Sequence, residues 1–228
     1  MSDYSDLCEM YGRSPSDPDF IDDLIDEIHL ENISEEYLWI LENGERSHYN
    51  ILDLHLDSVE TLCEQEVPGH VCFSLKVMLY GHVVSAIEGY LSSVFINVVS
   101  NSNILTRKLV ETDPEFSKRT FSMKDIFTEH SSLKITVASY LKGLIFHDLK
   151  KIKPMYNSVL GHDFGDISWF FKAVQLRHDC VHRAGFDKDG NKIEVTSESI
   201  LQLIKNIRDL VTEIEKTLNR VGQETLFE

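Results

Sequence analysis

The 228-residue sequence has few cysteines, and none of them belongs to a pattern that would build a disulfide framework or a metal site. Zinc ribbons and small disulfide-rich domains need paired or regularly spaced cysteines. Cys8, Cys63, Cys72 and Cys180 include no CxxC pair. The sequence also lacks the pattern of a signal peptide at its start. We therefore expect free thiols in a reducing cytoplasm.

An uninterrupted apolar run of membrane-span length is also missing. Residues 77–100 come nearest, but His82, Glu88 and several Ser and Gly residues interrupt them, and no segment rich in Lys or Arg follows closely. A spanning helix needs about 20 mostly apolar residues and usually carries positive charge at one flank. The segment therefore predicts a buried core helix, and we expect no membrane partner.

Positive charge is scarce in the first 66 residues and balanced in the rest. Residues 1–66 carry nineteen acidic residues against Arg13 and Arg46, a net charge of −17, while residues 67–228 carry nineteen acidic and twenty basic residues. The chain's net charge of −16 thus belongs to the N-terminal segment. It does not argue against nucleic-acid binding by the remainder, although an acidic segment could compete for a basic surface there.

The acidic region predicts a tail followed by a small α/β appendage. Residues 1–18 are rich in Ser, Asp and Pro and predict a mobile tail. Within residues 19–66, apolar residues recur at helical spacing from 19 to 29, and segments 37–41 and 51–57 are typical of an antiparallel strand pair. In the second segment, Leu52, Leu54 and Leu56 alternate with polar residues. Two strands are marginally stable alone, so the appendage should pack on the larger domain or on a partner.

Residues 67–220 predict a mainly α domain, an antiparallel up-and-down four-helix bundle. Pro68 and Gly69 mark its start, a polar connector is expected at 101–121, and residues 221–228 form a tail. Gly185 is expected to stop the third helix, and Thr196 or Ser197 to cap the fourth. Pro154 is expected in the loop after the second helix. The four predicted helices span about 70–99, 122–150 with a break near 130–132, 166–182 and 196–219.

A dense cluster of reactive side chains lies at the end of the third predicted helix. Residues 177–185 read Arg-His-Asp-Cys-Val-His-Arg-Ala-Gly. His178 and His182, at i and i+4, share one helix face. With eight arginines and ten histidines, an Arg-x4-His match arises by chance roughly 0.35 times in such a chain. The position of the match late in an all-helical domain therefore gives it its weight.

This segment resembles the signature of the HEPN family of ribonucleases, an Arg, commonly followed by Asn, Asp or His, and then a His about five residues after the Arg. The corresponding positions are Arg177, His178 and His182. The HDxVHRxG pattern, together with Ser-Ala-Ile-Glu-Gly-Tyr-Leu at 85–91, is similar to the RiboL-PSP-type branch. The resemblance covers roughly residues 67–220 and leaves the acidic N-terminal region unexplained.

The resemblance implies a metal-independent endoribonuclease of toxin or phage-defence type. It would use no cofactor, leave 2′,3′-cyclic phosphate and 5′-hydroxyl ends, and act as a homodimer with two Arg-x4-His motifs in one cleft. An antitoxin or sensor protein is a candidate partner. Arg177 and His182 would be catalytic, because an imidazole can transfer protons near neutral pH and a guanidinium can bind phosphate oxygens. The supporting residues would be His178, Asp179, Glu88 and Arg183.

Several side chains have a structural interpretation beside the catalytic one. Arg177 and His182 could satisfy the last carbonyls of the helix and pair with acidic neighbours, in a non-catalytic HEPN-like scaffold that binds RNA or protein and is regulated by a partner. Glu88 either pairs with this stretch or lies on a narrow solvated strip. The chain's one concentrated basic patch either solvates a helix end or binds RNA phosphates. It consists of Lys142, Lys150, Lys151 and Lys153.

Zinc is a further alternative, because His178 and His182 have the spacing of a zinc pair. The Glu of a zincin motif is missing, Cys180 points away from their face, and no third ligand is evident. We therefore expect no metal site, and we expect Cys180 to be a small buried residue and not a nucleophile.

Overall fold

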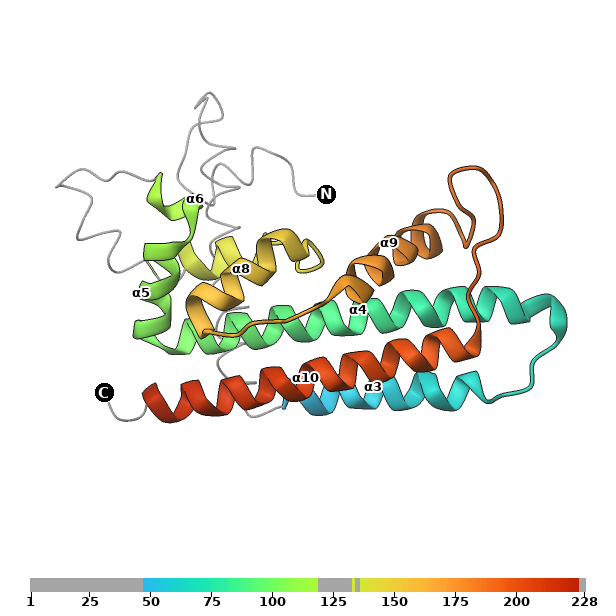
Figure 1. The fold of residues 1–228 in the computed structure, drawn as a ribbon, viewed down its shortest axis with the longest axis horizontal. Helices are drawn as coiled ribbons and strands as arrows, with labels where there is room; N and C mark the ends of the chain where they lie inside the picture. Colours follow the sequence, from blue (N-terminus) through green and yellow to red (C-terminus); the bar gives the residue numbers. More distant parts are fainter. Residues whose placement is uncertain (1–46, 119–132, 134–135, 226–228) are drawn as a thin grey trace, which may run out of the picture. The chain divides into compact units, whose positions relative to one another are not determined.

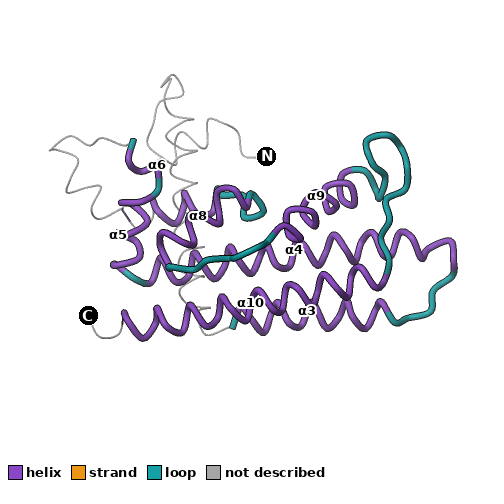
Figure 2. Tube along the Cα trace, in the orientation of Figure 1, coloured by secondary structure: helices purple, strands orange, loops and turns teal. Residues whose placement is uncertain are grey.

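The computed structural model describes residues 47–118, 133 and 136–225 of the chain. These residues all fall within one compact unit, residues 44–228. They are mainly helical, as predicted, and the described part contains no strand, only an isolated bridge between Phe186 and Lys192 (Figure 2). The tail, the helix at 19–29 and the strand at 37–41 that we expected lie outside the described residues.

Helix α4, Gly69–Asn101, is the element on which four of the other described helices pack. It contacts α3 (His48–Cys63), α5 (Asn103–Thr112), α9 (Ser168–His182) and α10 (Ser197–Thr225) (Figure 1). In the described part of the chain, α4 is the one helix long and apolar enough to cross a membrane, and 56% of its most apolar window is buried within the protein. Fourteen of its residues are buried, which is the pattern of a core helix in a bundle.

The strand expected at 51–57 is wrong, because these residues belong to helix α3. Alternating leucines fit a strand, but Leu52, Leu56 and Val59 follow each other at steps of four and three residues, and all three are buried. Only a helix places these three on one face. Leu54, which the strand would have aligned with Leu52, is 67% exposed. Helix α3 packs against α4 and α10, so it joins the helices that follow the expected boundary at residue 67.

The polar connector expected at 101–121 is also wrong in its first part, since it holds α5 and the short α6, Pro114–Ser117. Ser102 caps α5 by accepting a hydrogen bond from the Leu105 amide, and Asp113 caps α6 by accepting one from the Glu115 amide. These caps satisfy amides that a helix start leaves free. Buried apolar residues, including Leu105 and Leu109, then attach α5 to the core.

The helix expected at 122–150 is interrupted. In its described part, residues 136–142 are helical, residues 143–148 form a connection, and α8 runs over Leu149–Leu160. The break expected near 130–132 lies outside the described residues. Pro154 lies inside α8, not in the loop where we expected it. Helix α8 contacts α5 and α10.

The third and fourth predicted helices are confirmed as α9 and α10. Thr196 caps α10 reciprocally: the Ser199 amide donates to Thr196 Oγ1 at 3.1 Å, and the Thr196 amide donates to Ser199 Oγ at 3.0 Å. The apolar face of α10 is buried as expected, and the helix continues to Thr225, beyond the predicted end. The buried face includes Ile200, Leu203, Ile204, Ile207, Val211 and Ile214.

Candidate functional site

The end of α9 carries residues 177–182 and is fixed against α4 by a tight reversal of the chain. The amides of Arg183 and Gly185 both donate to the Asp179 carbonyl, at 3.2 and 3.0 Å. Ala184 and Gly185 have positive φ values of 52° and 87°. A Cβ on Gly185 would lie 2.6 Å from Val77 Cγ2 of α4. The chain reversal predicted at Gly185 is therefore found. It ends α9, and Gly185 follows Ala184, the first residue with a left-handed backbone.

Helices α9 and α4 also approach closely just before the end of α9, where Cys180 and Val181 face Gly81 of α4. A Cβ on Gly81 would lie 3.4 Å from Val181 Cγ2 and 3.8 Å from Cys180 Cβ. Cys180 is 5% exposed. Burial, and secondarily the charge of Asp179, raise the pKa of its thiol to about 11. This environment opposes the thiolate form, so Cys180 is a packing residue, as expected, and not a nucleophile.

Glu88 follows Gly81 by seven residues, about two helical turns, and so lies on the same side of α4. Its Oε2 is 4.0 Å from Arg177 Nη2, and the two side chains are 14% and 20% exposed. Of the two alternatives for Glu88, the structure thus supports the pairing with the 177–185 stretch. Glu88 Oε1 and Arg177 Nε are buried with no hydrogen-bond partner among the described residues. Such unsatisfied buried atoms are uncommon and mark a site that a ligand or water can complete.

His147 is a member of the site that the sequence did not reveal. It lies in the connection between residues 136–142 and α8, and its Nδ1 is 3.2 Å from Glu88 Oε2. The same carboxylate oxygen therefore faces both His147 and Arg177. No periodicity or spacing links His147 to the motif, since the contact depends on how the connection packs across α4. In the sequence, only the nearby lysines, Lys142, Lys150, Lys151 and Lys153, indicate a functional region here.

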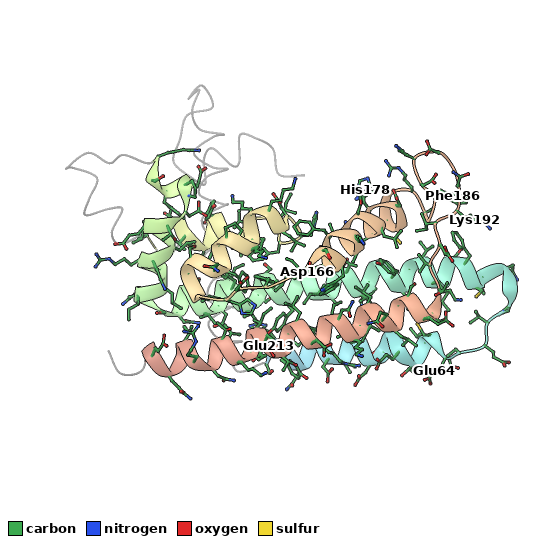
Figure 3. All side chains as sticks on the ribbon, in the orientation of Figure 1. Glu64, Asp166, His178, Phe186, Lys192 and Glu213 are labelled. Carbon is green, nitrogen blue, oxygen red and sulfur yellow. The ribbon has the colours of Figure 1, made fainter. Side chains whose placement is uncertain are left out.

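A pocket of about 450 Å³ opens beside these residues. His178 and His182 lie on one face, as expected, with ring centroids 4.7 Å apart. Figure 3 labels His178 toward the C-terminal end of α9. The volume is in the usual range for small-molecule pockets. Three imidazoles and one guanidinium thus surround a single hollow, whose lining is His147, Phe171, Val174, Gln175, Arg177, His178 and His182.

Two of the expected supporting residues are placed elsewhere. Asp179 and Arg183 form an ion pair with each other at i and i+4 and do not line the pocket. Arg183 is 41% exposed. This pair therefore stabilises the end of α9, whereas His178 lines the pocket with Arg177 and His182, and Glu88 pairs with Arg177.

The four lysines expected to bind RNA do not line this pocket either. Lys150 and Lys151 border a separate hollow of about 580 Å³ together with Asp113, Glu115 and Asp148. Lys151 also lies over the Tyr140 ring, with Nζ 5.0 Å from its centroid. Lys153 Nζ donates to the Gly165 carbonyl at 2.6 Å, and burial lowers the pKa of Lys142. The structure thus shows local partners for several of these lysines.

Among the residues that the structure describes, no group of three or more His, Cys, Asp or Glu side chains is placed to hold a metal ion. Comparisons of the chain with protein-family models, curated proteins and solved structures return no match. The chemistry of the pocket is therefore the basis on which a function can be assigned.

Proposed function

We propose that the protein is a metal-independent endoribonuclease of the HEPN type, which cleaves RNA by attack of a 2′-hydroxyl on the adjacent phosphate. The observation that carries the proposal is the grouping of Arg177, His178 and His182 around one pocket, with Glu88 Oε2 4.0 Å from Arg177 Nη2. The reaction would yield a 2′,3′-cyclic phosphate and a 5′-hydroxyl, without a cofactor.

The side chains of the pocket match what this reaction needs. It requires a proton acceptor for the 2′-hydroxyl, a proton donor for the leaving 5′-oxygen, and positive charge near the phosphate in the transition state. Arg177 provides a permanent charge and several donors, and its low exposure strengthens its effect on a bound phosphate. His182 would transfer the proton, and His178 would orient it or contact RNA.

The proposal extends to the assembly around this site. The four-helix unit of the resemblance would consist of α4, residues 136–142 with α8, α9 and α10, and α3 would be an addition to it. A second copy would bring a second Arg177 and His182 to the cleft, since a two-fold axis pairs identical surfaces. A toxin or phage-defence role would add an antitoxin or sensor protein that controls access to the pocket. The free thiols of Cys63, Cys72 and Cys180 fit a reducing cytoplasm.

The test is cleavage of RNA by the purified full chain in EDTA. We expect the wild type to cut and to leave cyclic phosphate and 5′-hydroxyl ends. Arg177→Ala and His182→Ala should each lower the rate by about 10²-fold to 10⁴-fold, because each removes a group that acts in the transition state. His82→Ala is the matched control, because His82 is an exposed histidine of α4 that contacts His55 and not the pocket.

Each other outcome has a definite meaning. Cleavage that persists in both variants would show that another site does the chemistry. Loss of wild-type cleavage in EDTA would indicate a metal-dependent enzyme. RNA binding without cleavage would favour the non-catalytic scaffold, in which the contact of Arg177 with Glu88 is a structural ion pair.

A further inference from the structure

His147 lies at the proposed catalytic pocket although no sequence motif marks it. It lines the pocket together with Arg177, His178 and His182, and its side chain is 36% exposed. It belongs to a connection between helices, whereas the other three belong to α9. The pocket therefore receives an imidazole from a second part of the chain, outside the helix that carries the motif.

One nitrogen of the His147 ring faces Glu88. Glu88 Oε2 is 3.2 Å from His147 Nδ1, which is the distance of an ion pair with a protonated imidazole. Because Nδ1 faces the carboxylate, Nε2 is the nitrogen left to exchange a proton with a molecule in the pocket. A carboxylate beside an imidazole can orient the ring, and catalytic histidines are often prepared for proton transfer in this way.

We propose that His147 gives a proton to the leaving 5′-oxygen, with Glu88 as its positioning residue, so that one chain holds both proton-transfer groups of the reaction. The inference rests on the proposed ribonuclease function. In its protonated form, His147 carries protons on both ring nitrogens, one on the nitrogen nearest Glu88 and the other available to the substrate. His182, whose ring lies beside that of His178, is then the proton acceptor.

The step balances without any further reactant. The 2′-oxygen loses its proton to His182 and forms a bond to phosphorus. The bond from phosphorus to the 5′-oxygen breaks, and that oxygen takes the Nε2 proton of His147. Arg177 stabilises the negative charge that builds up on the non-bridging oxygens. After cleavage His182 is protonated and His147 is neutral, and proton exchange with water restores both.

The experiment compares ordinary RNA with RNA whose scissile 5′-bridging oxygen is replaced by sulfur, because a thiolate leaves without being protonated. The variant is His147→Gln, which keeps a polar side chain near Glu88 but cannot act as an acid. Under single-turnover conditions we expect it to cut ordinary RNA about 10²-fold to 10⁴-fold more slowly than the wild type. On the sulfur-bridged RNA, its rate should return close to the wild-type rate.

Two further variants make the result specific. His182→Ala should be slow on both substrates, because the 2′-hydroxyl must still lose its proton. His82→Gln, which changes an exposed histidine outside the pocket, should match the wild type on both.

An equal loss by His147→Gln on the two substrates would overturn the inference, because a purely structural role slows both alike. An unchanged rate on ordinary RNA would overturn it too. If the wild type cuts neither RNA, the proposed ribonuclease function fails and this inference fails with it. These outcomes are distinguishable, because the wild type on ordinary RNA reports on the function alone. The unfolding midpoint of each variant, compared with that of the wild type, checks that the fold is intact.

Discussion

Gly185 has two independent reasons to be glycine. Its φ of 87° disfavours any side chain, and a Cβ would lie 2.6 Å from Val77 Cγ2 and 2.8 Å from Phe73 Cζ. We expect Gly185→Ala to lower the free energy of unfolding by about 3 kcal/mol, from backbone strain together with overpacking. Urea denaturation measures this change.

Gly190 is the matched control for that substitution. Its φ is 83°, nearly that of Gly185, but a Cβ there would have nothing within 4 Å. Gly190→Ala should therefore cost only the backbone strain, about 1 kcal/mol. Equal losses in the two variants would show that the contact of Gly185 with α4 contributes nothing.

His162 should make stability depend on pH. It is 4% exposed, its Nδ1 is 2.9 Å from Thr217 Oγ1, and burial lowers its pKa. The charges of Asp163 and Glu213 oppose this shift. Because the folded pKa lies below the unfolded value of about 6.5, the unfolded chain binds more protons once the pH falls through that value. Stability from neutral His162 is therefore present above this pH and is lost as the pH falls below it.

We expect the free energy of unfolding to decrease from pH 7.5 to 5.5, by at most about 1.4 kcal/mol per pH unit for one histidine. His162→Gln should flatten this slope in urea titrations at several pH values. Burial also lowers the pKa of His48, so part of the slope should remain. A slope that is identical in wild type and variant would rule out His162 as its source.

Arg208 of α10 forms ion pairs across to helix α3. It contacts Asp53, Asp57 and Glu60 of α3, at 3.3, 2.5 and 2.7 Å. These acidic residues repel one another when the arginine is removed. We expect Arg208→Ala to lower the free energy of unfolding by about 1 kcal/mol, since the arginine is 33% exposed and partly screened by water.

The loss caused by Arg208→Ala should be larger at low salt, because mobile ions screen exposed charges. Chemical denaturation at low and high salt measures this dependence. Arg107→Ala, which removes an exposed ion pair with Glu111 on α5, should leave stability unchanged. If the two variants behave alike, the cluster on α3 does not hold these helices together.

The success of sequence-based prediction differed among helices for an identifiable reason. Helix α10 repeats its apolar residues over many turns, so only one period fits, and it was predicted correctly. Segment 51–57 of α3 is short, and its alternating leucines fit periods of 2 and 3.6 about equally. Val59 resolves the ambiguity only once the burial of the segment is known. Short polar helices such as α5 depend on caps and on packing against α4, which composition does not show.

At the scale of the whole molecule, the proposed homodimer must form despite a net charge of −16 on each chain. Like charges oppose association, and salt screens them. We expect the dimer fraction, measured by analytical ultracentrifugation, to rise with ionic strength, and the cleavage rate per chain to rise with protein concentration. A monomer that cleaves RNA at a rate independent of concentration would show that the second copy is unnecessary.

The candidate site could be predicted mainly where it is local in sequence. His178 and His182 share a face because they are four residues apart, and this is confirmed. Glu88 was placed near Arg177 as one of two alternatives, because a carboxylate in an apolar helix needs a partner. His147 could not be found, since its contact with Glu88 depends on how a connecting segment crosses α4. The lysine patch rests only on the number of lysines close together in the sequence. That number does not show which groups each lysine contacts in the fold.

Because α9 and α4 pack closely at Gly81, the reactivity of the Cys180 thiol reports on the separation of these two helices. Its thiol is buried where α9 meets α4, whereas Cys63 and Cys72 are partly exposed. A thiol reagent should therefore modify Cys180 only when the end of α9 separates from α4. Since Arg177, His178 and His182 lie on that same end, the rate of Cys180 labelling would measure how often the pocket comes apart. A ligand that holds the pocket together should slow this labelling, and the measurement needs no engineered cysteine.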